Sequence, residues 1–409
     1  LPSHPQGYAL AVTGSRWNKD VRLAVIAASM AAGVLYGVED FNARVLATLG
    51  GVSPATLCGA LDKMPDVSVN EEPHVGTRGI WTWGYVVYDY KRFFDNMARL
   101  RMNSVTIWND CPSVNYPDVI SYAHSRGIKF ITGFQWGWGT DYDLSKAEDR
   151  QAIRDEVLVK YRREYRHLDI DGIYFQTLTE HSDLEIAGGT TASWACQLVN
   201  EVSCALLEET PDLHILFGLH ATSIRDRFTD LAPLDPRVVI VWEDAGLIPF
   251  SYEPRTEFYG KSSLPEGVKS IDDTIGYCKR LAALTVGGEF ALVPKGWTSL
   301  NWEEEFEHHK SFILGERSPE FIRQRLSERR LRWDCVNSLW LRNYPEAARF
   351  YRAMLDATSG KVAAWGLIED GLFEEEIQPS VALFAETLWN PRRADWEILG
   401  AAMNYCCKI

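Results

Sequence analysis

Short apolar runs that lead into acidic residues recur along this chain and limit the folds open to it. Residues 238–241 run directly into Trp242 and Glu243, and residues 173–175 lead to Glu180. A buried strand is built from apolar residues, whereas an acid at its end needs water or a partner. The parallel strands of a closed barrel all present their carboxyl ends at one rim. We therefore expect these acids and rings to meet in one pocket.

The apolar runs are numerous enough to predict a (β/α)8 barrel, an α/β fold, over residues 74–409. The expected strands are residues 78–83, 104–108, 129–134, 172–178, 214–219, 238–242, 289–293 and 362–367. Helical periodicity separates them, for example in residues 90–100 and 379–388, and a large helical insertion is expected around 303–358. Strands that alternate with helices are typical of a parallel sheet.

Residues 1–73 predict a small α/β domain in front of the barrel. Strands are expected at 8–12 and 21–25, a helix between 31 and 49, and a returning strand at 67–69. A chain of 409 residues has room for one barrel and one smaller module. The module is short for its type, so the chain could begin partway through it.

The charge balance excludes some classes of partner. The net charge is −14 and the pI about 5.2, which argues against nucleic acid or an anionic membrane surface. An acidic sugar is not excluded, because its recognition depends on local Lys or Arg. No apolar run reaches the roughly 18 residues of a membrane-spanning helix. The start of the chain lacks a signal-peptide pattern, so a cytoplasmic location and a secreted one with the signal removed both stay open, as does the oligomeric state.

Motifs for cofactors and metals are missing from the sequence. We find no GxGxxG after a first strand, no GxxxxGK[ST] phosphate loop, no HExxH and no EF-hand loop. The eight cysteines form no CxxC pair, which favours reduced thiols over a metal site or a disulfide framework. We therefore expect neither a cofactor nor a metal.

Three stretches resemble known glycoside hydrolases. "AAGVLYGVEDF" (31–41) resembles the small domain that precedes the barrel in family 20 β-hexosaminidases and family 67 α-glucuronidases. "YDYKRFFDNMARLRMNSVTIW" (88–108) is similar to the helix and second strand of their barrels, and "PSVALFAETLWNP" (379–391) to the last barrel helix. The resemblance implies a glycosidase-type barrel whose partner is an oligosaccharide or a glycoconjugate.

The two families differ at the end of the fourth barrel strand, which is residues 172–178 here, and this chain matches neither family fully at that point. Hexosaminidases that use the substrate's acetamide as nucleophile carry two adjacent acids there, whereas this chain has Thr179 before Glu180. Family 67 enzymes have a single glutamate, although their local motif is also absent here. The resemblance thus implies that Glu180 is the general acid and that Glu243 or Asp244 acts opposite it.

The residues themselves are compatible with those roles. A carboxyl group walled by apolar side chains can hold its proton near neutral pH, as a general acid requires. A second carboxylate roughly 5–5.5 Å away would act as nucleophile, and one roughly 6.5–9.5 Å away would activate water. The family analogy favours the second, inverting, arrangement. Alternatively, Glu180 is a surface acid and Glu243 or Asp244 caps a helix.

Aromatic and polar residues at the strand ends are candidates for binding a sugar, because flat rings cover its C–H faces. They are Trp81, Trp83, Trp108, Asn109, Asp110, Trp136, Trp138, Gln176, His220, Trp242, Lys295, Trp297 and Glu369. Trp136 and Trp138 are favoured because neighbouring glycines leave their rings room to be exposed, and Lys295 is the best-placed cation for a uronate. Alternatively, the tryptophans fill the core, the acids form structural salt bridges, and His220 is simply buried and hydrogen-bonded.

Together these observations predict an exo-acting glycoside hydrolase that removes a terminal sugar, with a uronic acid as one option. The alternatives are a non-catalytic glycan-binding barrel, a β-N-acetylhexosaminidase-like enzyme, and a barrel lyase or isomerase acting on a sugar acid.

Overall fold

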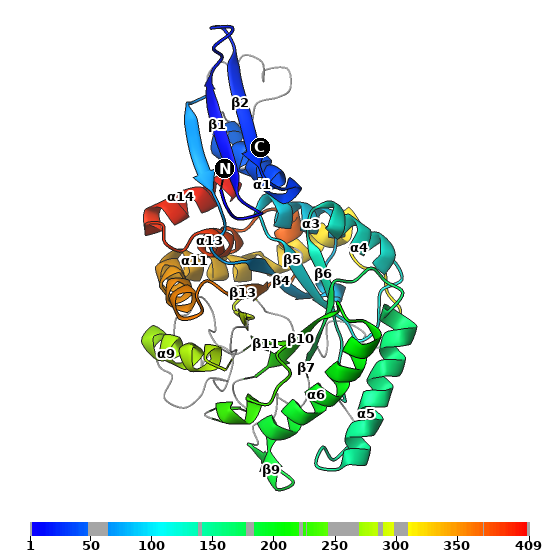
Figure 1. The fold of residues 1–409 in the computed structure, drawn as a ribbon. Coiled ribbons are helices and arrows are strands. Elements are labelled where there is room, and N and C mark those ends of the chain that lie inside the picture. Colours follow the sequence, from blue (N-terminus) through cyan, green and yellow to red (C-terminus); the bar gives the residue numbers. More distant parts are fainter. Residues whose placement is uncertain are drawn as a thin grey trace.

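A closed barrel of eight parallel strands forms the main body of the molecule (Figure 1). The computed structural model describes residues 2–47, 64–137, 141–176, 184–220, 224–225, 227–243, 270–284, 289–297, 310–370 and 372–406. The barrel strands are β4 (Thr77–Trp83), β5 (Ser104–Trp108), β6 (Lys129–Gly133), β7 (Gly172–Gln176), β10 (His214–Leu219), β11 (Val238–Trp242), β12 (Phe290–Leu292) and β13 (Val362–Leu367). Each strand pairs with the next along the chain, and β13 closes on β4. The predicted fold class is confirmed.

Helices surround the barrel. They are α3 (Tyr90–Arg99), α4 (Tyr116–Ser125), α5 (Ala147–Lys160), α6 (Thr191–Glu209), α9 (Ile271–Ala282), α11 (Pro319–Ala357), α12 (Leu372–Glu375), α13 (Pro379–Trp389) and α14 (Asp395–Cys406). Side-chain caps fix four of these starts: Asp89, Thr190, Ser270 and Ser318 each accept a backbone N–H of α3, α6, α9 and α11 in turn. Within the expected insertion, α11 is one helix of 39 residues. No helix in the described part of the chain is long and apolar enough to span a membrane.

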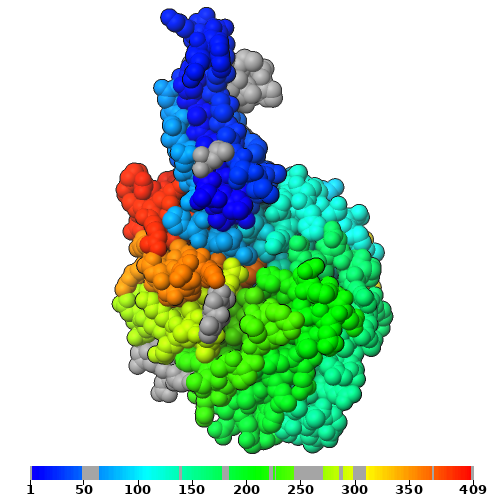
Figure 2. All heavy atoms as spheres, in the orientation of Figure 1, coloured from blue at the N-terminus to red at the C-terminus, as the bar shows by residue number. Residues whose placement is uncertain are grey.

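The described part of the N-terminal module is a three-stranded antiparallel sheet of order β2-β1-β3 with the helix α1 beside it. Its elements are β1 (Tyr8–Gly14), β2 (Arg22–Ala28), α1 (Ala31–Phe41), the π-helical turn η1 (Asn42–Leu46) and β3 (Val67–Glu71). Figure 2 shows it as a narrow projection on one end of the barrel. Because β3 leads directly into β4, this is the end at which the barrel strands begin.

Trp389 of α13 joins the module to the barrel. Its ring belongs to the small core of the module, with Tyr8 and Tyr36. The guanidinium groups of Arg78 and Arg101 lie over the same ring, 5.2 and 4.1 Å from its centroid. The junction is therefore apolar and cationic at once, and it closes the amino-terminal end of the barrel.

Alternation along each strand separates two layers of side chains. In β11, Val238, Ile240 and Trp242 pack in the layer shared with the helices. Val239 and Val241 belong instead to the cluster at the barrel centre. Successive side chains of a strand point to opposite faces. The parity of a residue therefore decides whether it can reach a pocket at the barrel mouth.

Candidate active site

The inward-facing positions at the carboxyl ends of the strands carry most of the predicted polar residues. Counting in steps of two from the interior residues of β7, β10, β11, β12 and β13 leads to one position on each strand end. These positions are Gln176, His220, Glu243, Lys295 and Glu369. Gln176, His220 and Lys295 all contact Glu243. These four side chains therefore meet at the rim of the barrel, where the sequence predicts the pocket.

Glu243 is the centre of this group. Its side chain is buried, and the residue is only 4% exposed. The carboxylate atom Oε1 accepts hydrogen bonds from the Tyr174 hydroxyl and the Gln176 amide. The other oxygen, Oε2, lies 3.3 Å from His220 Nε2 and 3.5 Å from Lys295 Nζ. The ends of four neighbouring strands thus hold one carboxylate in a fixed orientation.

Gly218 of β10 makes this arrangement possible. A Cβ atom at this position would lie well inside van der Waals contact of both the Tyr174 hydroxyl and Glu243 Oε1. Any larger residue would therefore force the tyrosine and the carboxylate apart. The glycine is required here by close approach rather than by backbone conformation.

Aromatic rings fill the barrel centre below the polar group. Trp81 stacks on Trp108, with centroids 6.2 Å apart, and Trp83 and Tyr174 contact these rings edge-on. All four side chains are buried and belong to the interior cluster. Tyr174 joins this aromatic cluster to the carboxylate of Glu243, so the two kinds of residue expected at a sugar site lie together.

Three other tryptophans do not face the mouth. Trp136 is 0% exposed and stacks on Phe175, and Trp297 stacks on Trp340 of α11. Together with Trp242 they lie in the layer between strands and helices. The predicted exposure of Trp136 is wrong, because Phe175 and the surrounding helices cover its ring. Because Trp136, Trp242 and Trp297 all lie in this core layer, we do not expect them to contact a sugar directly.

The residues after β5 are engaged in the scaffold. Asn109 Oδ1 accepts the N–H of Gly84 at 3.1 Å, and its amide donates to the Tyr116 hydroxyl. The carbonyl oxygen of Asp110 accepts a hydrogen bond from Lys160 at 3.0 Å. Asn109 is fully buried, so its amide fixes the loop after β4 in this structure.

The structure also reveals a second ionic cluster, at the end of β13, whose arginine partners sequence reasoning did not identify. Asp370 follows the predicted Glu369, and both are buried. The carboxylate of Asp370 lies 3.5 Å from Arg325 Nε and 3.2 Å from Arg329 Nε. Its φ of 96° is rare for a non-glycine residue, and such strain often occurs at functional sites. Arg325 also donates to the Tyr88 hydroxyl at 3.1 Å.

Both arginines come from the amino-terminal half of α11. Ile322 and Leu326 of the same helix join the barrel-centre cluster, so this end of α11 lies over the rim. The spacing of Arg325 and Arg329 by one helical turn was a signal that they share a face. Nothing in the sequence, however, indicated which strand end that face would meet.

Three predicted residues cannot be placed. Trp138, Glu180 and Asp244 lie outside the described residues, so their separation from Glu243 stays undetermined. In the described part of the chain, no group of three or more His, Cys, Asp or Glu side chains is arranged to hold a metal ion.

Comparison with known proteins shows likeness of fold without likeness of sequence. No protein-family model matches the chain, and no curated protein matches it in sequence. CpGH84B superposes with a TM-score of 0.52 at 10% identity, over 98% of this chain and 60% of its own. The GH20 exo β-N-acetylglucosaminidase of Vibrio harveyi, solved with N-acetylglucosamine, gives 0.50 at 10% identity, over 98% and 66%.

This chain thus spans less than two thirds of the length of either protein. At such low identity the likeness establishes the barrel fold alone. The predicted resemblance to family 20 enzymes is therefore confirmed for the fold, whereas the resemblance to α-glucuronidases stays a prediction.

Proposed function

We propose that this chain is an exo-acting glycoside hydrolase that removes a terminal sugar from an oligosaccharide or glycoconjugate. The observation that carries the proposal is the buried carboxylate of Glu243, which is held by donors from neighbouring strands and bound by Tyr174 of the aromatic cluster in the barrel. Barrel enzymes carry their chemistry at this rim. Glycosidic cleavage needs an oriented carboxylate, and rings suit the apolar face of a sugar.

In the proposed mechanism Glu180 protonates the leaving oxygen, and Glu243 or Asp244 acts on the other side of the sugar. That second carboxylate either activates water or attacks the anomeric carbon, depending on its distance from the acid. Tyr174 and Gln176 would serve as positioning residues, because they already fix Glu243 Oε1. A carboxylate oriented before the substrate arrives loses little entropy during the reaction.

A uronic acid is the substrate class that the charges at the rim favour. Lys295, Arg325 and Arg329 are all partly exposed, with side chains between 16% and 19% accessible. A sugar carboxylate could bind one of these cations in exchange for part of its contact with Glu243 or Asp370.

The second candidate is a β-N-acetylhexosaminidase. The fold likeness to the Vibrio harveyi enzyme favours it. Against it stands Thr179, which occupies the place of the first acid of the pair expected in such enzymes.

A panel of aryl glycosides and aryl uronides, assayed with wild type and Glu180→Gln, tests the proposal. We expect hydrolysis of at least one class, and a loss of turnover by orders of magnitude in the variant for poor leaving groups, with unchanged folding. Unchanged turnover would remove Glu180 from the mechanism. Binding without turnover, measured by calorimetry, would support a glycan-binding barrel instead.

A further inference from the structure

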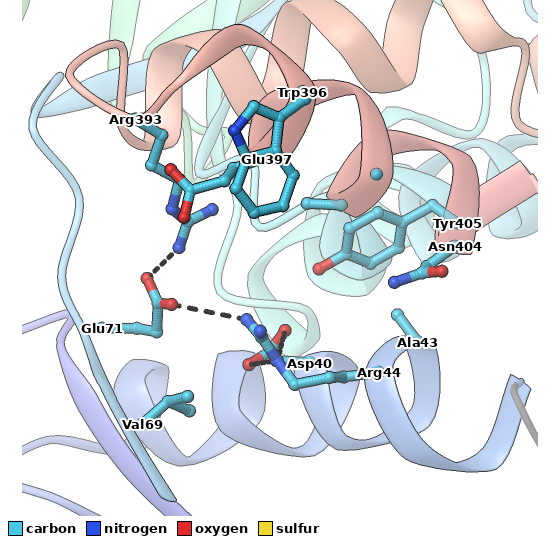
Figure 3. Close-up of a pocket in the computed structure, with 12 residues that line it drawn as sticks. Asp40, Ala43, Arg44, Val69, Glu71, Arg393, Trp396, Glu397, Asn404 and Tyr405 are labelled. Atoms are coloured by element: carbon cyan, nitrogen blue, oxygen red, sulfur yellow. Dashed lines mark hydrogen bonds and ion pairs between the residues drawn. The ribbon is translucent and has the colours of Figure 1, made fainter. Parts of the chain in front are cut away.

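A cavity of about 430 Å³ lies between the N-terminal module and α14, at the closed end of the barrel (Figure 3). One wall comes from α1, η1 and β3 of the module, with Arg44 and Glu71. The opposite wall is α14, with Trp396 and Tyr405, and Arg393 comes from the loop before that helix. Its volume is in the range of pockets that take small ligands.

Small residues on α14 create the hollow. Gly400 follows Trp396 by one helical turn, and Ala401 lies one turn before Tyr405. A Cβ atom at Gly400 would meet no atom within 4 Å, so packing does not demand a glycine. Glycine inside a helix makes that helix less stable than alanine would. The helix thus gives up stability at the place where a larger side chain would fill the cavity.

Both arginines of the cavity are paired with carboxylates, which argues against an anionic ligand. Arg44 bridges Asp40 at 3.1 Å and Glu71 at 3.4 Å. Arg393 binds the other oxygen of Glu71 and also contacts Glu386 at 3.1 Å. An anion would have to compete with these carboxylates for both guanidinium groups. The walls instead offer alternating donors and acceptors, which suits a neutral ligand rich in hydroxyl groups.

Tyr405 supplies an independent sign of a ligand. The residue is 3% exposed, and its hydroxyl has no hydrogen-bond partner among the described residues. Figure 3 shows this hydroxyl on the side of the ring that faces Arg44 and Asp40. A buried polar group without a partner lowers stability, so a ligand hydroxyl that reached this atom would remove an existing penalty.

Trp396 completes the set of contacts. It is 73% exposed, although indole rings are usually well covered, and it stands at the edge of the cavity. A flat ring beside paired polar side chains is the combination that binds a sugar, whose C–H face stacks while its hydroxyls form hydrogen bonds.

We propose that this cavity, the junction site, binds one or two residues of a neutral glycan. It is formed by Arg44, Glu71, Arg393, Trp396 and Tyr405, and it lies at the end of the barrel opposite Glu243. The proposal does not rest on the hydrolase activity, because binding here needs no catalytic group. It would let the protein hold a glycan at a point remote from the barrel mouth.

Calorimetric titration of the full chain with neutral cello-, xylo- and chito-oligosaccharides tests the junction site. We expect binding of at least one series, weakened tenfold or more by Trp396→Ala and by Gly400→Leu. The leucine should fill the cavity and raise Tm, so loss of binding there could not come from unfolding. Trp17→Ala is the matched control. Trp17 is also an exposed tryptophan of the N-terminal module, but it lies in the β1–β2 turn and does not line the cavity.

Tyr405→Phe separates recognition from structure. Removing the hydroxyl should weaken binding while leaving Tm unchanged or higher, because the free protein loses an unpaired buried group. Glu243→Gln should leave this binding intact, which distinguishes the junction site from the barrel mouth. Three results would each overturn the proposal: no binding of any neutral series, binding of charged oligosaccharides only, or affinities that Trp396→Ala and Gly400→Leu leave unchanged.

Discussion

The two ends of the barrel both bury ionic groups, but they use them differently. At the carboxyl rim, Glu243 is bound by side chains from the ends of successive strands. At the amino end, the buried pair of Arg101 and Glu386 joins the β5 side of the barrel to α13. Arg101 also donates to the Tyr8 hydroxyl of the module at 3.1 Å. The first cluster orients one carboxylate, whereas the second ties two parts of the chain together.

At the amino end, the guanidinium of Arg78 is fully used by contacts within the protein. Its guanidinium donates to the carbonyl oxygens of Val75, Gly76 and Arg101 and to Gln6 Oε1, at 2.7–3.2 Å. Burial lowers the pKa of Arg78 to about 10. A cation whose donors are used by backbone carbonyls has little left for a ligand. The comparison predicts that substitutions at the rim change turnover and that substitutions at the amino end change stability.

The largest expected effect is loss of turnover in Glu243→Gln. The amide is nearly isosteric but can neither attack nor accept a proton, so kcat should fall roughly 10²–10⁴-fold. Steady-state kinetics on the best aryl substrate of the panel measure the effect. Thermal unfolding should show that the variant is still folded.

Glu289→Gln is the matched control for Glu243→Gln. Glu289 is an acid at the other end of the barrel, immediately before β12, and contacts Thr77 at 3.5 Å. Its substitution should leave kcat unchanged. Equal losses in both variants, or none in either, would contradict the assignment of chemistry to the rim.

The next effect is on stability, in Glu386→Gln. This change removes the carboxylate from a fully buried guanidinium, and breaking such a pair costs about 3–5 kcal/mol. Chemical denaturation should therefore show a clearly lower midpoint, while kcat of the folded enzyme stays the same. Replacing both partners, as in Arg101→Met with Glu386→Leu, should recover part of the loss, because no unpaired charge is left. If Glu386→Gln lost activity without losing stability, the assignment of stability to the amino end and of turnover to the rim would be wrong.

The sequence predicted the barrel well because its strands are short apolar runs, and most observed bounds lie within two residues of those expected. It also predicted that Gln176, His220, Glu243 and Lys295 would meet, because parallel strands end at one rim. The tryptophans were less well assigned. Trp242 and Glu243 are neighbours and so face opposite sides of the sheet, and the alternation itself could have shown that only one reaches the mouth.

Contacts between distant segments could not be predicted in this way. Arg325 and Arg329 meet Asp370 because of how α11 crosses the rim, and no local pattern encodes that crossing. The junction site has the same origin. Its walls come from residues 40–44 and 69–71 on one side and 393–405 on the other, which come together only after the last barrel helix returns to the module.

The last effect is a pH dependence, and it concerns a buried acid that, among the described residues, has no cation beside it. Glu374 of α12 accepts the N–H of Tyr88 at 2.7 Å, and burial raises the pKa of its carboxyl to about 8 despite that hydrogen bond. Between pH 4.5 and about 8 the folded state therefore holds a proton that the unfolded state has lost. Stability must fall as pH rises through this range, by at most ~1.4 kcal/mol for each pH unit.

Glu374→Gln should remove that slope, because the amide is neutral at every pH. We expect the variant to equal wild type near pH 5 and to become more stable than wild type towards pH 8, as measured by urea denaturation at several pH values. Glu375→Gln is the control on the same helix, since Glu375 is exposed and paired with Arg92 at 3.1 Å, a contact that contributes at most ~1 kcal/mol. If Glu374→Gln and wild type keep a constant difference from pH 5 to 8, the buried carboxyl of Glu374 is not protonated in the folded protein.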